Sequence, residues 1–338
     1  MKLRLLAACA VLLTALLTIT PAMAQDNSRN WEYGNVIATT QVHIEPGSLI
    51  HALQNHDELT LELVHFWFVH KDDRYTCFGK EWSGAELRGH IRAQMYERLA
   101  GPAAPYNRRF VENGVACTTA SICAAALGIR DLTALTAEPK EKIQRLHLLL
   151  AAYNALQPGV FALSGWDLVG ALPLPFAQVA HLAVDGDSRW INRGGYDLLG
   201  AMPGATASSG GLPVAASLYG PLPDQLARPD SFASQLREML ALRQACGLFR
   251  ARQIAVPECE NPSLLVMVHE LPDELPGSGG VQVTALNFGP EAAEERVVIP
   301  GAGPVMDMRT GEAVGLVEDG QLAVAVEGYG WRSFLVGE

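Results

Sequence analysis

The spacing of apolar residues in the first half of the chain predicts two buried strands separated by helices. Residues 47–57 form an apolar run that predicts a buried strand. Residues 58–70 follow at once and predict a helix that is apolar nearly all round, which is typical of a buried helix. Residues 71–83 are expected to form a loop. A second short apolar run predicts another buried strand at 159–164.

Between and after these strands, apolar residues recur at the helical period. Residues 84–100 predict a helix with one apolar face, and TTASICAAALG predicts a short helix capped by Thr118 or Thr119. Residues 139–156 predict a strong helix with Pro139 near its start. Strands separated by helices indicate a parallel α/β arrangement.

The C-terminal part follows a different pattern. Residues 170–229 are rich in Gly and Pro and predict loops, whereas 230–247 predict a helix capped by Asp230 or Ser231. After Pro257 the apolar residues alternate with a period of two, in LLVMVHEL, VQVTALNF, RVVIP and LAVAVEG. These segments predict the strands of a small all-β domain.

Residues 1–24 have the composition of a secretory signal peptide. Lys2 and Arg4 precede an apolar run, and PAMA places small residues before Gln25. A membrane span is the weaker interpretation, because the run is short and ends in Pro21. The expectation is therefore a secreted or periplasmic protein that has no membrane association after cleavage. The odd number and irregular spacing of the remaining cysteines predict buried thiols rather than a disulfide framework, which agrees poorly with an oxidising compartment.

Charge and motifs exclude several classes of function. The net charge of −11 argues against a nucleic-acid partner, because binding to phosphates needs a basic surface. The histidines form no HxxxH or HxH pair, and no Gly-rich phosphate loop follows a strand. We therefore expect neither a metal site nor a cofactor.

Polar side chains stand at the end of both predicted strands. Asn55, His56 and Asp57 end the first, and Trp166 and Asp167 follow the second. Reacting groups of parallel barrels lie at the carboxyl ends of the strands, so both segments are expected to contribute to one site. A simple alternative is that Asp57 only caps the helix that follows it.

These residues carry a resemblance to a known family. LQNHDEL resembles the fourth conserved motif of the α-amylase superfamily, glycoside hydrolase family 13, and PGVFALSGWDLVG resembles its eighth barrel strand with the loop that follows. Longer stretches resemble the trehalose synthases, also called maltose α-D-glucosyltransferases. They are HALQNHDELTLELVHFW, ERLAGPAAPYNRRFVENGVACTTAS, AAALGIRDL, LYGPLPDQLARPDSFASQL and LLVMVHELPD. The resemblance runs from about Trp31 to near the C-terminus.

The resemblance implies a fold and domain boundaries. The family has a (β/α)8 TIM barrel followed by a β-sandwich, and residues 47–57 and 159–164 would be barrel strands seven and eight. We therefore expect the last strands of an incomplete barrel within 25–250, with an inserted helical subdomain at 71–158. An antiparallel β-sandwich domain is expected at 251–338.

The resemblance also implies an activity, the interconversion of maltose and trehalose by intramolecular transglucosylation. Such retaining chemistry uses one carboxylate as nucleophile and another as acid/base. By resemblance Asp57 would stabilise the transition state, and His56 would bond to the sugar. Asn55, Trp166 and Asp167 would complete the sugar-binding residues. Maltose, trehalose or related α-glucosides would be the ligands.

The sequence departs from the family at the chemical centre. In the family, the nucleophilic Asp, the acid/base Glu and a further His-containing motif all precede strand seven, but only about 30 residues separate Gln25 from Asp57. Such a barrel takes ~250 residues. The chain is thus expected to be the C-terminal part of such an enzyme, inactive alone, with a separate N-terminal barrel fragment as its partner. Other acids are candidates by residue type only: Asp72, Asp73, Asp167, Asp185, Asp187 and Asp197.

Three alternatives stay open at the level of sequence. The chain could be a non-catalytic α-glucan- or disaccharide-binding or structural remnant. The gene start could be misplaced, which would favour the cytoplasmic location typical of the family. Trp166 and Asp167 could anchor a buried loop instead of binding sugar. The same choice between sugar recognition and loop stabilisation applies to a polar and aromatic cluster comprising Arg189, Trp190, Arg193, Tyr196 and Asp197.

Overall fold

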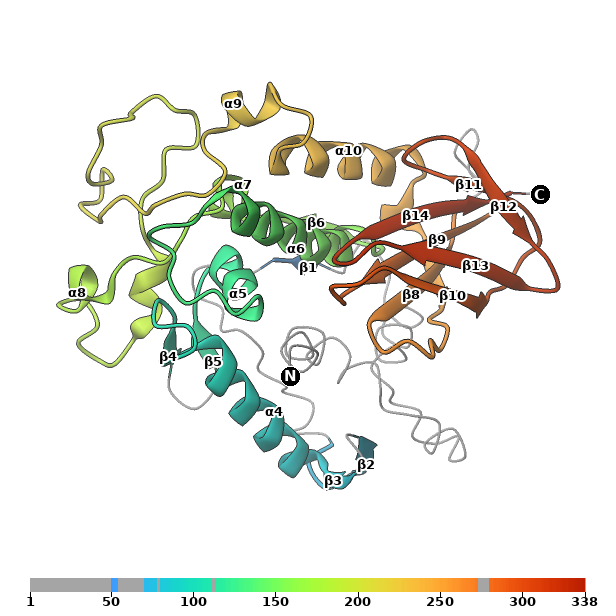
Figure 1. Ribbon diagram of the computed structural model, residues 1–338, viewed down its shortest axis with the longest axis horizontal. Coiled ribbons are helices and arrows are strands. Elements are labelled where there is room, and N and C mark those ends of the chain that lie inside the picture. Colours follow the sequence, from blue (N-terminus) through green and yellow to red (C-terminus); the bar gives the residue numbers. More distant parts are fainter. Residues whose placement is uncertain (1–49, 54–69, 78–79, 111–113, 273–279, 338) are drawn as a thin grey trace. The chain divides into compact units, whose positions relative to one another are not determined.

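The computed structural model describes residues 50–53, 70–77, 80–110, 114–272 and 280–337 (Figure 1). Asn55, His56 and Asp57 lie outside the described residues, as does the helix expected at 58–70 apart from His70. The described chain divides into two compact units. The first unit contains Leu53–His147 and Leu163–Gln235, and the second contains residues 50–52, Leu148–Ala162 and the chain from Leu236 on. No helix among the described residues is long and apolar enough to cross a membrane.

The first unit starts with a hairpin where the sequence predicted only a loop. Strands β2 (Arg74–Cys77) and β3 (Lys80–Ser83) pair antiparallel, with Tyr75 opposite Trp82. Helix α4 (Gly84–Leu99) follows directly and confirms the helix expected at 84–100. Ser83 caps it, since the Ser83 hydroxyl accepts from the Glu86 N–H at 3.2 Å and the Glu86 carboxylate accepts from the Ser83 N–H at 2.8 Å. Its buried residues recur at the helical period: Leu87, Ile91, Met95 and Leu99.

Two further predicted helices are confirmed. Helix α5 (Thr119–Ala126) is fully buried, and of the two candidate caps it is Thr118 that accepts from the Ser121 N–H. Helix α6 (Ala137–Ala155) matches the helix expected at 139–156. Between α4 and α5 lies a short antiparallel pair, β4 (Arg108–Phe110) and β5 (Gly114–Ala116).

The Gly- and Pro-rich segment at 170–229 is mostly loop, as expected, and contains three short helical turns. They are α8 (Phe176–Val179), the 3₁₀ turn η3 (Ser188–Asn192) and α9 (Leu222–Leu226). A small core holds this segment in place, because Leu174, Val179, Ile191 and Ala215 pack together with Ala116 of β5. The turn α7 (Gly165–Val169) precedes it.

In the second unit, the two predicted barrel strands pair with each other. Strands β1 (Ile50–Ala52) and β6 (Val160–Ala162) run parallel, with Ile50 opposite Val160. Ile50 is 70% exposed and Val160 is 49% exposed, which is unusual because parallel strands are normally covered on both faces. No third strand joins this pair among the residues that the structure describes. The parallel pairing is thus observed, and a barrel is not.

Helix α10 (Phe232–Ala245) confirms the helix expected at 230–247, and its N-terminus is capped by Ser231, whose hydroxyl accepts from the Ser234 N–H at 3.2 Å. The turn η4 (Leu248–Arg250) leads into the C-terminal strands.

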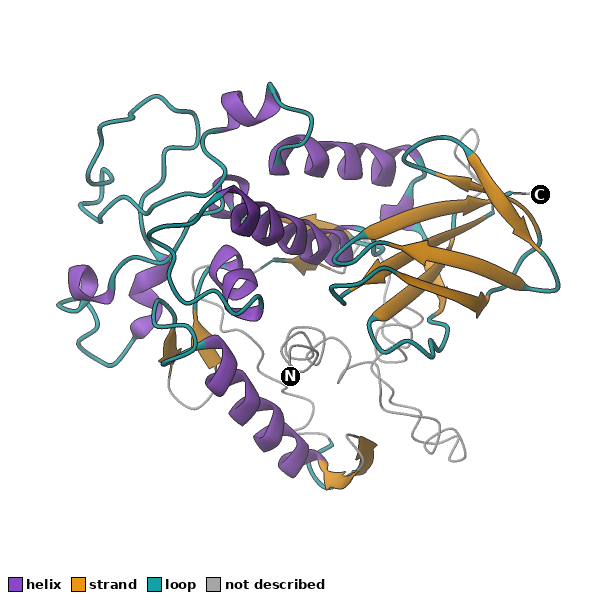
Figure 2. Cartoon of the chain, in the orientation of Figure 1, coloured by secondary structure: helices purple, strands orange, loops and turns teal. Residues whose placement is uncertain are grey.

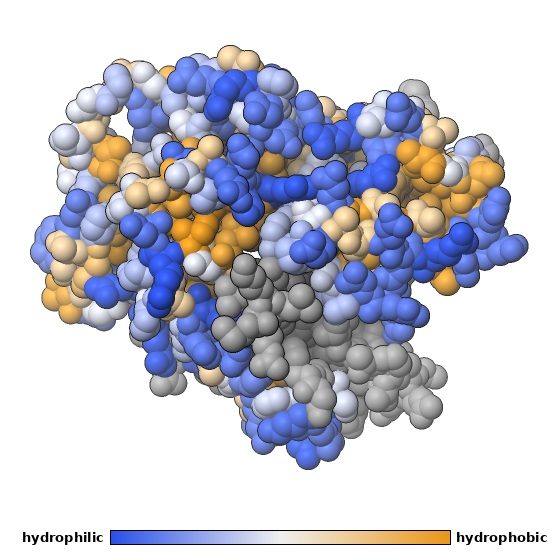
Figure 3. Space-filling model, viewed as in Figure 1, coloured by the Kyte–Doolittle hydropathy of each residue, from blue (hydrophilic) through white to orange (hydrophobic). Residues whose placement is uncertain are grey.

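The C-terminal strands form two antiparallel sheets (Figures 1 and 2). The larger has the order β12-β11-β14-β9-β8-β7, and the smaller pairs β10 with β13. Apolar residues from both sheets, such as Val266, Val283, Val324 and Phe334, form one core between them. The strands are β7 (Arg252–Ala255), β8 (Leu264–Glu270), β9 (Val281–Asn287), β10 (Ala293–Val298), β11 (Gly303–Asp307), β12 (Ala313–Val317), β13 (Gln321–Val326) and β14 (Trp331–Val336). The all-β arrangement expected after Pro257 is therefore confirmed. Most of the face drawn in Figure 3 is polar, in keeping with the charge of the chain.

A buried polar network crosses three neighbouring strands of the larger sheet. His269 on β8 lies opposite Gln282 on β9, and His269 Nδ1 is 2.7 Å from the Gln282 Oε1 atom. The Gln282 amide donates in turn to the hydroxyls of Thr284 and Ser333, at 2.7 and 2.8 Å. Because burial lowers the pKa of His269 to about 4, the ring is uncharged in the folded protein at neutral pH.

This network predicts a loss of stability in mild acid. The unfolded chain binds a proton at His269 below the ordinary histidine pKa of about 6.5, whereas the folded chain does so only below about 4. The free energy of unfolding is therefore expected to fall between pH 6.5 and 4, by on the order of 3 kcal/mol from His269. Burial also lowers the pKa of His51, which adds an effect of the same sign. The free energy of unfolding, measured with urea at several pH values, should change less with pH in His269→Gln than in the parent. An equal change with pH in both proteins would contradict the prediction.

Candidate functional site

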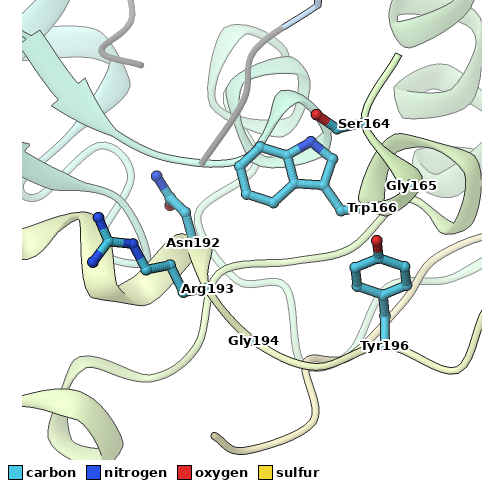
Figure 4. A pocket seen from close by; sticks show the side chains of 7 residues that line it. All are labelled: Ser164, Gly165, Trp166, Asn192, Arg193, Gly194 and Tyr196. Carbon is cyan, nitrogen blue, oxygen red and sulfur yellow. The ribbon is translucent and has the colours of Figure 1, made fainter. Parts of the chain in front are cut away.

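A pocket of about 380 Å³ lies within the first unit, between α7 and the end of η3. It is lined by residues 164–166, residues 192–194 and Tyr196 (Figure 4). In the view of Figure 4, the indole of Trp166 lies between the side chains of Asn192 and Tyr196. No acidic residue is among the described residues that line this pocket.

The turn α7 sets the position of Trp166 directly after β6. The Asp167 N–H donates to the Ser164 carbonyl at 3.0 Å, and the Ala171 N–H donates to the Trp166 carbonyl at 2.9 Å. Gly170 closes the turn with φ 60°, a left-handed conformation that glycine adopts readily. Trp166 is only 6% exposed and packs against Val169, so its indole forms a fixed wall of the pocket.

The opposite side of the pocket is fixed by η3. Asp187 caps this turn by accepting from the Arg189 N–H at 3.0 Å, and its carboxylate also binds the Arg189 guanidinium at 2.9 and 3.1 Å. Hydrogen bonds from the Arg189 side chain are the main reason that the pKa of Asp187 lies below its ordinary value. Ile191 is buried, and its carbonyl accepts from the Leu174 N–H at 2.8 Å. These contacts fix the backbone that carries Asn192.

Asn192 is the most unusual residue of the pocket. It is 3% exposed, and neither the Nδ2 nor the Oδ1 atom of its amide has a hydrogen-bond partner among the described residues. A buried polar group without a partner costs about 1–3 kcal/mol. Such groups therefore call for a specific explanation. The amide offers donors and an acceptor side by side, and would be satisfied by a ligand with neighbouring hydroxyl groups.

Tyr196 adds a second aromatic surface, and it is 40% exposed. Its hydroxyl approaches the backbone of Gly165 so closely that a Cβ atom at this position would lie 2.4 Å from it. Glycine is thus needed at position 165 for Tyr196 to reach α7. The pocket combines aromatic surface with an unsatisfied amide, which is the usual composition of a site for small polar ligands.

The structure separates the predicted site residues into three groups. Asn55, His56 and Asp57 lie outside the described residues, so their assigned roles stay predictions. Trp166 lines the pocket. Asp167 does not; it is 2% exposed, and its Oδ1 atom lies 3.2 Å from His147 Nε2. Whether either residue binds sugar is therefore still a prediction.

Members of the polar and aromatic cluster at residues 189–197 also differ in whether they line the pocket. Arg193 and Tyr196 line the pocket. Asp197 instead accepts from the N–H groups of Ala201 and Met202, at 3.0 and 2.7 Å, which fits the loop-stabilising alternative. Arg189 also stabilises its own segment, through an ion pair with Asp187. Asn192 could not be singled out from the sequence, because the residues around it give no sign that its amide is buried without a partner.

No group of three or more metal-binding side chains is found within the described part of the chain.

Comparisons with known proteins give a distant structural similarity. No family model matches the chain, and no curated protein matches it. Amy13B of Eubacterium rectale has 16% identity and a TM-score of 0.40, over 66% of this chain and 37% of that one. An α-amylase of Geobacillus thermoleovorans, solved with acarbose, has 13% identity and a TM-score of 0.39, over 64% and 36%.

The isomaltulose synthase of Erwinia rhapontici has 15% identity and a TM-score of 0.41, over 57% of this chain and 38% of that one. The chain thus spans less than two fifths of the length of these three enzymes. It has a distant structural similarity, over part of its length, to these amylase and isomaltulose synthase structures.

Proposed function

We propose that the chain is the C-terminal part of an α-glucoside-active enzyme of the trehalose synthase type, and that its pocket binds a glucose ring. The observation that carries the proposal is the buried, unpartnered amide of Asn192 beside the aromatic side chains of Trp166 and Tyr196. An aromatic surface matches the apolar face of a sugar, and an amide matches two adjacent hydroxyls.

The identity of the sugar rests on the sequence. The longer stretches that resemble trehalose synthases support maltose and trehalose as ligands. Trp166 lies in PGVFALSGWDLVG, which resembles the eighth barrel strand of the wider superfamily and the loop that follows it. A second candidate function is binding without chemistry, as a disaccharide- or α-glucan-binding module. It is favoured by the lack of any acidic residue among the described residues that line the pocket.

Titration calorimetry with Asn192→Leu tests the proposal. The parent chain is expected to bind maltose or trehalose more tightly than the β-linked disaccharide cellobiose. Asn192→Leu is expected to bind about 30-fold more weakly, because the ligand loses two hydrogen bonds to the amide, each contributing ~1 kcal/mol. The same variant is expected to be as stable as the parent or more stable, since it removes the cost of an unpaired buried amide.

Asn154→Ala is the matched control, because its amide donates to the Leu150 carbonyl within α6 and does not line the pocket. This variant should bind the disaccharide like the parent. Equal affinity of Asn192→Leu and the parent would show that the pocket is not the sugar site.

A further inference from the structure

A buried chain of three polar side chains includes Asp167, the residue that follows Trp166 of the pocket. His147 of α6, Asp167 of α7 and Tyr219 are 0%, 2% and 6% exposed. His147 Nδ1 lies 3.0 Å from the Tyr219 hydroxyl, and His147 Nε2 lies 3.2 Å from Asp167 Oδ1. All three belong to the first unit, but they come from distant parts of the sequence.

The three groups match one another as hydrogen-bond donors and acceptors. Burial raises the pKa of Tyr219 well above its ordinary value, so the hydroxyl keeps its proton and can donate. In the arrangement that matches every group, His147 Nε2 donates to the Asp167 carboxylate and His147 Nδ1 accepts from the Tyr219 hydroxyl. The other carboxylate oxygen, Oδ2, is buried with no hydrogen-bond partner among the described residues. The contact with His147 is therefore important for offsetting the cost of burying the Asp167 carboxylate.

The segment that carries Tyr219 also holds the backbone of α7. The Tyr219 N–H donates to the Val169 carbonyl at 3.1 Å, and the Leu218 N–H donates to the Gly170 carbonyl at 3.1 Å. Gly170 touches the Tyr219 ring so closely that a Cβ atom there would lie 2.6 Å from it. Phe232 stacks on Tyr219 with ring centres 5.0 Å apart, and also packs against His147 at 4.5 Å.

The turn α7 needs contacts with the surrounding protein to keep its orientation. It has five residues, and helices of this length are not stable without tertiary contacts. Trp166 and Asp167 are consecutive, so their side chains point in directions about 100° apart around the turn. A fixed Asp167 side chain therefore also constrains the direction in which the Trp166 side chain leaves the turn, and packing against Val169 holds the indole from there.

We propose that Tyr219, His147 and Asp167 form a positioning chain that holds the Trp166 indole in place as the wall of the sugar pocket. As a statement about sugar binding, this inference rests on the proposed function. His147 and Tyr219 do not line the pocket, so they act on the ligand through Asp167 and α7.

The test compares two replacements of His147. In His147→Gln, the amide can accept from Tyr219 and donate to Asp167, so the chain of hydrogen bonds is kept. In the double variant His147→Leu with Asp167→Leu, both buried partners become apolar. This replacement leaves no buried charge unpaired, but it removes the partner of the Tyr219 hydroxyl and the link from His147 to α7.

The readout is the indole N–H signal of Trp166 in a nitrogen-15 NMR spectrum, assigned by its loss in Trp166→Phe. In the absence of sugar, the double variant is expected to shift or broaden this signal while the other indole signals stay in place. His147→Gln is expected to keep the parental signal. The affinity for maltose is expected to fall about tenfold in the double variant, since small displacements in a site have large effects.

An unchanged Trp166 signal in a folded double variant would overturn the proposal. If the double variant does not fold, Tyr219→Phe takes its place, because it keeps the stacked ring and removes only the hydroxyl. In that variant a shifted Trp166 signal supports the proposal and an unchanged one overturns it. If the parent binds neither maltose nor trehalose, the proposed function fails, but the sugar-free indole signal still decides whether the chain positions Trp166.

Discussion

Incubation of the purified 338-residue chain with maltose is expected to yield neither trehalose nor free glucose at an enzymatic rate. Retaining transfer needs a nucleophilic carboxylate and an acid/base carboxylate on either side of the glycosidic bond. The resemblance gives neither of these acids a counterpart in the chain, and the described residues that line the pocket include no acid. General acid/base catalysis alone contributes about 10²–10⁴-fold to such rates.

Chromatography of the reaction products measures the rate directly, with an intact trehalose synthase in the same buffer as a positive control. We expect turnover at least about 10⁴-fold below that control. Turnover of about one per second or more would contradict the expectation, because this is the ordinary range of enzymes. Asp167 would then be the first residue to replace.

The second large effect is expected when the two acids are supplied on a separate protein fragment. If the proposed function holds, addition of an N-terminal fragment of a trehalose synthase that carries both acids is expected to restore the conversion of maltose to trehalose. Asp57→Ala is then expected to lower the restored rate by about 100-fold or more, because a charged group aimed at the transition state contributes this much.

Asp72→Ala serves as the matched control for this experiment. Asp72 is an acid of the same type, and its side chain is 86% exposed. Its replacement should leave the restored rate unchanged. Restoration that is equally strong in Asp57→Ala and in Asp72→Ala would show that the role assigned to Asp57 by resemblance is wrong.

Periodicity in the sequence was enough to predict the longer elements. The apolar face of α4 recurs at Leu87, Ile91 and Met95, and all three side chains are buried. The cap of α5 at Thr118 could be predicted to within one residue, because threonine is common at this position. The clear alternation in β13 also appears in its burial, with every second residue inside.

Elements without a regular pattern could not be predicted. In β3 the residues Lys80 and Glu81 are exposed and Trp82 is half-buried, so no alternation marks a strand. In β12 the four residues from Ala313 to Leu316 are all exposed, and the strand exists because it pairs with β11. Each of these strands pairs with the strand just before it, and no alternation of apolar residues within the strand itself indicates this pairing.

The candidate site shows more clearly which residues could not be predicted from the sequence. Trp166 could be singled out because it follows a predicted strand. The importance of Asn192 depends on burial, which results from Ile191 packing into a core that includes Leu174 and Ala215. His147 lies within the apolar run LHLLLAA of α6 and resembles an ordinary core residue. Its link to Asp167 appears only in three dimensions.

A crystal structure of the chain grown with saturating maltose tests the central claim most directly. The account predicts a glucose ring in the pocket, against Trp166 and Tyr196, with two of its hydroxyls bonded to the Asn192 amide. Maltose bound elsewhere on the protein, with this pocket unoccupied by sugar, would contradict the account.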